Sequence, residues 1–324
     1  MTSSTSPGLT SVRGEITADP AIDLSMGSEL HFVSTQVTTS GFRDGIGAVR
    51  ELDTFDGLLL SLHFGGSHGY SVDGSAALVA PGVALCATHV IAPYFDALKS
   101  SQAGCLCIGP SKSGLQIWRV KTVTGVPGTD ITILGLVYSS AVPSDRTFRQ
   151  WTLTTRMPRV GERMTLTGFR PTSKIVSTDG GLHCNGNVIA SVGAVTATFP
   201  TGRDRAMIPW AAVEIDCAAL GAMSGGPAYD EDGRLVGLVC TSVTGETGAG
   251  GPAYVSLLWG AFAYPFSGGW PEGLLPGTRS LLQLDPRVCS IVGREAIEMI
   301  GKGETLAWRH ISDHEGPSAD AARK

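Results

Sequence analysis

The stretch Gly221-Ala222-Met223-Ser224-Gly225-Gly226-Pro227 sets one serine among small and turn-forming residues. On its own, such a stretch is typical of a glycine-rich turn between two strands. The residues after it favour a second interpretation, because a polar hairpin with Asp232-Gly233 at its tip leads into the apolar run 235–240. A serine in a tight loop before such a hairpin can present its hydroxyl and nearby backbone N–H groups, as a nucleophile in acyl transfer requires. That chemistry also needs a base and an acid that orients the base.

Two segments upstream of the serine carry such groups. His89 ends the second of two apolar runs, 74–80 and 83–90, which are separated by Pro81-Gly82. Asp130 follows a Pro-Gly turn and begins another apolar run. The order is His, Asp, Ser, with 41 residues from the histidine to the aspartate and 94 from there to the serine. The alternatives are a buried histidine satisfied by the backbone and an aspartate that caps a turn.

Three motifs in this order resemble those of chymotrypsin-fold (trypsin-like) serine proteases of the bacterial type without a signal peptide. They are Ala87-Thr88-His89, Asp130-Ile131-Thr132-Ile133-Leu134 and Met223-Ser224-Gly225-Gly226-Pro227. The resemblance implies a hydrolase with a catalytic triad, a serine endopeptidase that forms an acyl-enzyme on Ser224. His89 would be the general base, and Asp130 would orient it. An esterase is a variant of the same chemistry.

The composition favours a turn-rich all-β protein, and the resemblance implies that it forms two antiparallel six-stranded β-barrels, chymotrypsin-like; a C-terminal helix and an N-terminal extension are expected in addition. The 324 residues include 43 glycines and 18 prolines, and only 16% are charged, as in turn-rich β proteins. The expected divisions are a partly ordered N-terminal extension (1–47), a first barrel with the histidine and aspartate (48–140), a second barrel with the serine (141–262), a C-terminal extension with a helix (263–311) and a flexible tail (312–324). First-barrel strands are expected near 58–64, 75–80, 83–88, 115–123 and 131–137.

The C-terminal helix is predicted from a local pattern. Asp285-Pro286 resembles an N-cap followed by proline at the first helical position. A rough helical stripe follows and ends at Gly301; it comprises Val288, Ile291, Val292, Ile297, Met299 and Ile300. We expect this helix to pack on the second barrel. The Pro-Gly-Trp-rich stretch 264–278 before it has no predicted role.

By resemblance, the oxyanion hole is formed by the backbone N–H groups of Ala222 and Ser224. The sequence departs from the family here, because most members have glycine at the position of Ala222 and often an acid at that of Met223. A Cβ at Ala222 restricts the backbone, so the loop is expected to need substrate or a partner to organise it. Without the acid, activation by pairing with a new N-terminal amine is not expected.

The substrate pocket is also predicted by resemblance. Its floor is placed at Ala218, one wall at Cys240, Thr241 and Ser242, and the opposite wall near Pro252. The floor has no aspartate, so a preference for Lys or Arg before the cut is disfavoured and a small or medium apolar side chain is expected. Glu246, in the loop between the walls, could change this preference.

Composition limits the partners, the compartment and the cofactors. The net charge of −5, without a Lys/Arg cluster, argues against nucleic acid as a partner. Seven cysteines, an odd number, occur without a secretory leader, and Val90 stands where secreted relatives have cysteine. A reducing, cytoplasmic location is therefore expected. Cys105-x-Cys107 with His183-Cys184 matches no common zinc spacing, so no metal and no cofactor are expected. The apolar segment 76–95 is interpreted as two buried strands, with no membrane association.

Two functional hypotheses from different classes remain. The first is the active endopeptidase, with a protein or peptide as substrate and a regulatory protein as a further partner. The alternative is a catalytically latent protease-fold protein that serves as a binding or scaffold module and needs a partner to organise its oxyanion loop. His63 and His68 are interpreted as surface or loop histidines outside the site.

Overall fold

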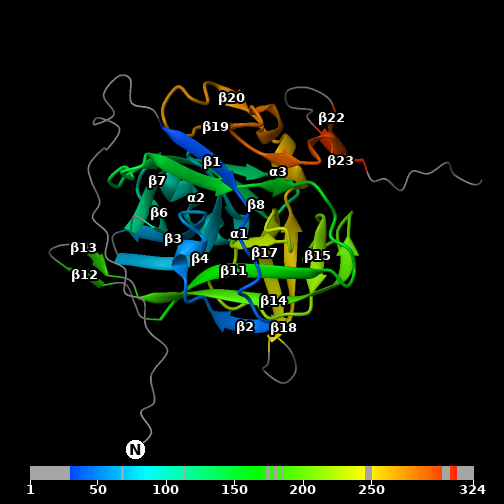
Figure 1. Ribbon diagram of the computed structural model, residues 1–324. Helices are drawn as coiled ribbons and strands as arrows, with labels where there is room; N and C mark the ends of the chain where they lie inside the picture. The colour runs from blue at the N-terminus through cyan, green and yellow to red at the C-terminus, as the bar shows by residue number, and fades with distance from the viewer. Residues whose placement is uncertain are drawn as a thin grey trace, which may run out of the picture.

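The computed structural model describes residues 30–66, 69–112, 114–172, 176–178, 181–183, 185–244, 250–300 and 307–311. Two closed six-stranded antiparallel β-barrels pack against each other (Figure 1). The double barrel predicted from the sequence is therefore confirmed.

The first barrel closes in the order β3-β4-β5-β8-β7-β6. Its strands are β3 (Leu59–Gly66), β4 (Gly69–Ala80), β5 (Val83–Ala87), β6 (Gly104–Ser111), β7 (Gly114–Val126) and β8 (Ile131–Tyr138). β4 and β5 form a tight hairpin, because Gly82 adopts a φ of 59° and allows the chain to reverse. Strand β6 was not predicted from the sequence. Its alternating burial places Cys105 and Cys107 inside the barrel.

The second barrel is a ring of six strands within a nine-stranded sheet. The ring is β11 (Arg163–Pro171), β14 (Gly186–Phe199), β15 (Ala212–Ile215), β18 (Gly250–Leu257), β17 (Leu235–Thr244) and β16 (Pro227–Tyr229). The short strand β16 closes it by pairing with both β11 and β17. Strands β2 (Gly45–Ala48), β10 (Leu153–Thr154) and β21 (Ile291–Val292) extend the sheet beyond the ring.

Shorter elements connect and flank the barrels. They are η2 (Leu52–Thr54), α1 (Thr88–Ile91), η3 (Ala92–Tyr94), α2 (Phe95–Lys99), β12 (Val176–Thr178), β13 (Gly181–His183), α3 (Trp259–Ala263), β19 (Phe266–Ser267), β20 (Thr278–Arg279), η4 (Leu281–Gln283), η5 (Arg294–Ala296), β22 (Ile297–Ile300) and β23 (Ala307–His310). None of the helices in the described ranges is both long and apolar enough to cross a membrane.

Part of the predicted N-terminal extension is built into the body of the protein. Strand β1 (His31–Thr35) pairs in parallel with β9 (Thr147–Trp151), which lies in the segment between the two barrels. Strand β2 pairs with β14 of the second barrel. Residues 1–29 of the extension and the tail 312–324 lie outside the described residues.

The helix predicted over 285–300 is wrong. The chain forms a turn after Asp285, then β21, the 3₁₀ turn η5 and the strand β22, which pairs with β23. Gly293 has a φ of 73°, in the left-handed region, so a right-handed helix cannot continue through it. The apolar stripe is also not one buried face, because Val292 and Ile300 are exposed while Ile291 and Ile297 are buried.

The stretch 264–278 covers the end of the first barrel. Trp270 is 2% exposed and packs among Trp118, Tyr138 and Phe148, with ring centroids 5.9, 5.3 and 5.2 Å away. The backbone of Trp270 also lies against the β4–β5 turn, where a Cβ on Gly82 would be 2.1 Å from the backbone nitrogen of Trp270. In Figure 1 this orange segment, with β19 and β20, lies beside the blue strand β1, whose Phe32 also contacts Trp270. The stretch therefore fastens the C-terminal region to the first barrel.

Candidate active site

His89 lies where strand β5 turns directly into the short helix α1. Val90 and Ile91, the next two residues, are buried and anchor the helix, whereas the His89 side chain is 48% exposed. The backbone N–H of Thr88 donates to the carbonyl oxygen of Asp130 at 3.1 Å. The local fold therefore fixes the backbone of His89 and leaves its ring accessible.

Asp130 lies next to His89 because strands β5 and β8 pair with Ala87 opposite Ile131. Its carboxylate is 6% exposed and accepts two hydrogen bonds from the histidine. One comes from the backbone N–H at 3.0 Å, and the other joins Oδ2 to ring Nδ1 at 2.8 Å. A carboxylate cannot donate, so Nδ1 carries the hydrogen. Nε2 of a neutral ring is then the basic nitrogen.

Ser224 lies in the loop between β15 and β16, in the second barrel, and this loop packs closely on the first. The backbone N–H of Ser75 in β4 donates to the Ser224 carbonyl oxygen at 2.9 Å. Gly225 has a φ of 80°, and a Cβ there would be 2.3 Å from the Ser75 carbonyl oxygen. A Cβ on Gly226 would be 2.0 Å from the Thr167 carbonyl oxygen. These close contacts explain the two glycines after the serine.

The backbone at Ala222 is unusual. Its φ is 69°, in the left-handed region, which is unfavourable for a residue with a Cβ by about 1–2 kcal/mol. Within the described part of the chain, the backbone N–H groups of Ala222 and Ser224 donate to no protein acceptor. Met223 is fully buried, and its Sδ accepts the N–H of Leu220 at 3.3 Å. The position where the family often has an acid is therefore occupied by a core side chain.

No hydrogen bond joins the Ser224 hydroxyl to the His89 ring among the residues that the structure describes. Catalytic hydrogen bonds are often long or poorly aligned without substrate and tighten in the complex. The structure thus brings the histidine and aspartate into direct contact and places the serine loop against the same barrel.

Cys240 is 5% exposed and lies beside Asp130. Burial, the negative charge of Asp130 and a side-chain hydrogen bond to Asp130 together raise the pKa of its thiol. The thiol is therefore neutral at physiological pH. The sequence predicted this residue only as a pocket wall, because nothing in the chain order indicates contact with the aspartate.

The other predicted pocket residues lie on neighbouring segments. Thr241 and Ser242 are in β17, and Pro252 is in the paired strand β18, where Ser242 stands opposite Ala253. Ser242 Oγ donates to the carbonyl oxygen of Ala219 at 2.9 Å, so the predicted wall contacts the segment that contains Ala218. The predicted pocket residues other than Cys240 are all half-buried: Ala218, Thr241, Ser242 and Pro252. Glu246 lies outside the described residues.

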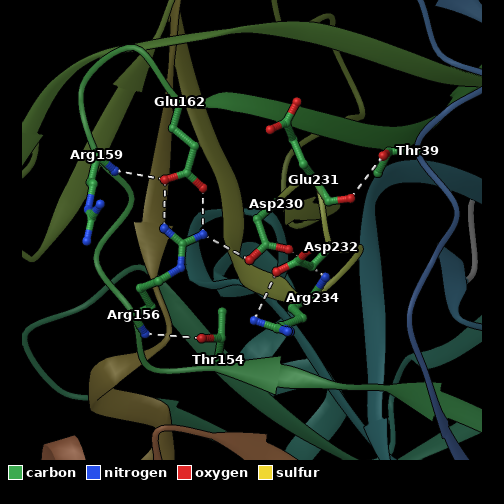
Figure 2. Close-up of polar contacts among 9 residues, drawn as sticks. All are labelled: Thr39, Thr154, Arg156, Arg159, Glu162, Asp230, Glu231, Asp232 and Arg234. Carbon is green, nitrogen blue, oxygen red and sulfur yellow. Dashed lines mark hydrogen bonds and ion pairs between the residues drawn. The ribbon is translucent and has the colours of Figure 1, made fainter.

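An ion-pair network supports the hairpin that follows the serine loop (Figure 2). The Arg156 guanidinium donates to both carboxylate oxygens of Glu162, at 2.6 and 2.5 Å, and to Asp230 Oδ2 at 2.9 Å. Asp230 is 2% exposed, and its Oδ1 accepts the backbone N–H of Arg234 at 2.9 Å. The network connects the segment between the barrels to the turn joining β16 and β17. These residues were not predicted from the sequence, where each is an ordinary charged loop residue.

His63 is not a surface histidine, so the interpretation from the sequence is wrong. It lies in β3, is 3% exposed, and its Nε2 is 2.7 Å from Ser61 Oγ. Burial lowers its pKa to about 4, so the ring is neutral. The side chain lies against the second barrel, where the ring of Phe169 in β11 is 6.4 Å away between ring centroids. His68 lies outside the described residues.

Three of the most similar solved structures are proteases or protease domains. The HtrA-type protease AlgW with tripeptide is 20% identical with a TM-score of 0.42; the match covers 62% of this chain and 56% of that one. The MamO protease domain from Magnetospirillum magneticum is 17% identical, with a TM-score of 0.42 and coverage of 65% and 95%. The active form of the Rv3671c protease from M. tuberculosis is 13% identical, with a TM-score of 0.43 and coverage of 72% and 87%.

A comparison with curated proteins gave no match. The family model of the trypsin-like peptidase domain matches residues 74–238, just over half of the 324 residues. The matched segment begins within β4 and ends in β17, beyond Ser224, so it includes all three candidate residues. The chain therefore belongs to the trypsin-like peptidase domain family.

Proposed function

We propose that the protein is a serine endopeptidase that cleaves peptide bonds through an acyl-enzyme on Ser224. The observation that carries this proposal is the pairing of His89 with Asp130. A nearly buried carboxylate holds the ring through Nδ1 at 2.8 Å and the backbone at 3.0 Å, while the ring remains half-exposed. This arrangement suits a general base whose second nitrogen is available to a nucleophile.

Each step follows from what these groups can do. As Ser224 Oγ attacks the substrate carbonyl, His89 Nε2 accepts the hydroxyl proton, because a serine hydroxyl is too weakly acidic to react alone. The imidazolium then gives this proton to the leaving amine. In the second half, His89 takes a proton from water as the water attacks the acyl-enzyme, and the imidazolium returns this proton to Ser224 Oγ as the acid leaves. Asp130 remains ionised and stabilises the imidazolium in both halves.

The charge that develops on the carbonyl oxygen needs hydrogen-bond donors. The backbone N–H groups of Ala222 and Ser224 suit this role, because neither donates to an acceptor among the described residues. Removing one such donor typically costs about 3 kcal/mol of transition-state stabilisation. The left-handed backbone of Ala222 gives this loop a conformation that most residues avoid.

Substrate preference and compartment belong to the same proposal. A small or medium apolar side chain before the cut is supported by the half-buried Ala218, Thr241 and Ser242, which bring no charge to the predicted pocket. A reducing compartment such as the cytoplasm is supported by the six described cysteines, which are buried with free thiols.

A catalytically latent binding or scaffold protein is the second candidate. Two observations favour it: the missing Ser224–His89 hydrogen bond within the described residues and the unfavourable backbone of Ala222. On this view, a partner or ligand would have to organise the loop before turnover could occur.

Cleavage of a peptide library by the purified protein tests the proposal. Mass spectrometry of the products should show cleavage by the wild type and none by Ser224→Ala or His89→Ala. Ser144→Ala changes an exposed serine in a turn and should retain full activity. Equal cleavage by wild type and Ser224→Ala would refute the proposal. A folded wild type that cleaves no peptide would favour the latent protein.

A further inference from the structure

Ser75 is a fully buried residue of strand β4 that contacts the serine loop from the opposite barrel. Its hydroxyl donates to the carbonyl oxygen of Ala222 at 3.0 Å and accepts the backbone N–H of Phe169 at 2.8 Å. Its backbone N–H donates to the carbonyl oxygen of Ser224 at 2.9 Å. One residue of the first barrel thus binds two carbonyl groups of the loop that carries the nucleophile.

The direction of the Ser75 hydroxyl is determined by its neighbours. A hydroxyl has one hydrogen to donate, and the Phe169 N–H already occupies one of its acceptor sites. The hydrogen therefore goes to Ala222. The side chain is fully enclosed, so no bulk water competes for this bond. The contact fixes the carbonyl end of the Ala222 residue.

Ala222 requires such support more than a glycine would. Its φ of 69° lies in the left-handed region, where a Cβ is disfavoured and glycine is not. The N–H of the same residue is one of the two proposed oxyanion donors. A loop that left this conformation would turn that N–H to a different direction.

We propose that Ser75 is a positioning residue for the oxyanion loop. Its hydroxyl holds the Ala222 carbonyl and so keeps Ala222 in the left-handed conformation that glycine would adopt unaided. This inference rests on the proposed acyl-transfer function. Ser75 does not contact the reacting atoms; it acts through Ala222. Its backbone bond to Ser224 is independent of the side chain, so Ser75→Ala removes the hydroxyl contact and leaves the backbone contact in place.

Four proteins test the proposal: the wild type, Ser75→Ala, Ala222→Gly and the double variant. For each, kcat and KM on a cleaved peptide and the rate of labelling with a fluorophosphonate are measured. One lost hydrogen bond of ordinary strength corresponds to roughly a tenfold change. We expect Ser75→Ala to lower kcat and the labelling rate about tenfold with little change in KM. In the Ala222→Gly background, the same substitution should lower them less than about threefold, because glycine needs no support.

A purely structural role for Ser75 predicts that Ser75→Ala lowers the rate by a similar factor in both backgrounds. Ser75→Ala also leaves the buried N–H of Phe169 without its acceptor, which lowers stability in either background. On our proposal, Ser75→Ala lowers the melting temperature by the same amount in the wild-type and the Ala222→Gly backgrounds. The loss in kcat and labelling rate is instead much smaller in the Ala222→Gly background. A similar loss of rate in both backgrounds, or no loss in either, would overturn the proposal.

A measurement independent of activity separates this proposal from the proposed function. The scalar coupling between the Ala222 amide and α protons, measured by NMR, reports its φ. We expect the coupling and the amide shift to change in Ser75→Ala, as the residue leaves the left-handed region. An unchanged φ would overturn the positioning role. A changed φ in Ser75→Ala, together with a wild type that neither labels nor cleaves, would instead contradict the endopeptidase function.

Discussion

Asp230→Ala tests the ion-pair network behind the serine loop most directly (Figure 2). The substitution removes two interactions of a carboxylate that is only 2% exposed: the 2.9 Å bond from Arg156 and the 2.9 Å bond from the Arg234 N–H. A hydrogen bond to a charged group contributes about 1.5–3 kcal/mol, and one more hydrogen bond about 1 kcal/mol. We therefore expect the free energy of unfolding to fall by about 3 kcal/mol.

A larger loss is not expected, for a structural reason. Breaking a fully buried ion pair costs about 3–5 kcal/mol when the remaining charge has no partner. Arg156 keeps both oxygens of Glu162 and is 38% exposed, so its charge stays compensated. At roughly 2–4 °C per kcal/mol for a chain of this size, the melting temperature should fall by roughly 6–12 °C.

Asp232→Ala is the matched control on the same hairpin. Asp232 is 63% exposed and pairs with Arg234 at 3.1 Å, a surface contact that contributes about 0–1 kcal/mol. Urea unfolding followed by tryptophan fluorescence measures both variants. Burial is the basis of the predicted difference. A loss below about 1 kcal/mol for Asp230→Ala, or equal losses for the two variants, would refute the reasoning.

Three further predictions concern other parts of the molecule. Burial acts to raise the pKa of Glu162, but hydrogen bonds and charge from Arg156 and the Arg159 backbone outweigh it and lower the pKa. The stabilising contribution of the Glu162 carboxylate is therefore complete above the ordinary value of 4.5 and is lost as pH falls through the lowered pKa. In thermal melts, the melting temperature of Glu162→Gln should fall less between neutral and acidic pH than that of the wild type. Trp270→Ala should lower the free energy of unfolding by about 3–5 kcal/mol in urea titrations, because it empties an aromatic cluster; a loss below about 1 kcal/mol would contradict this. Cys240 should resist iodoacetamide in the folded protein, since its thiol is buried with a raised pKa; rapid native alkylation seen by mass spectrometry would contradict this.

The double barrel could be predicted by resemblance because the motifs that carry the resemblance are local signals. The apolar run ending at His89, the aspartate directly before β8 and the glycines after Ser224 each depend on neighbours in the chain. The glycines in particular are required by contacts of 2.0 to 2.3 Å that any Cβ would make. At such positions the residue type itself, here glycine, indicates the local structure.

Interactions between segments that are distant in the chain could not be predicted in this way. Ser75 lies 147 residues from Ala222, and Asp230 lies 74 residues from Arg156, so their contacts exist only in the folded chain. The predicted C-terminal helix failed for a related reason. Its apolar spacing suited a helix, but Gly293 takes a left-handed φ and β22 finds a partner in β23, which tertiary structure supplies.

Labelling with a fluorophosphonate, followed by peptide mapping, tests the central claim most directly. The wild type should carry one adduct, and it should map to Ser224, because the loop of this serine packs against the barrel that holds the His89–Asp130 pair. Ser224→Ala should carry none, and His89→Ala should label far more slowly. A folded wild type without an adduct, or one labelled equally after Ser224→Ala, would contradict the account.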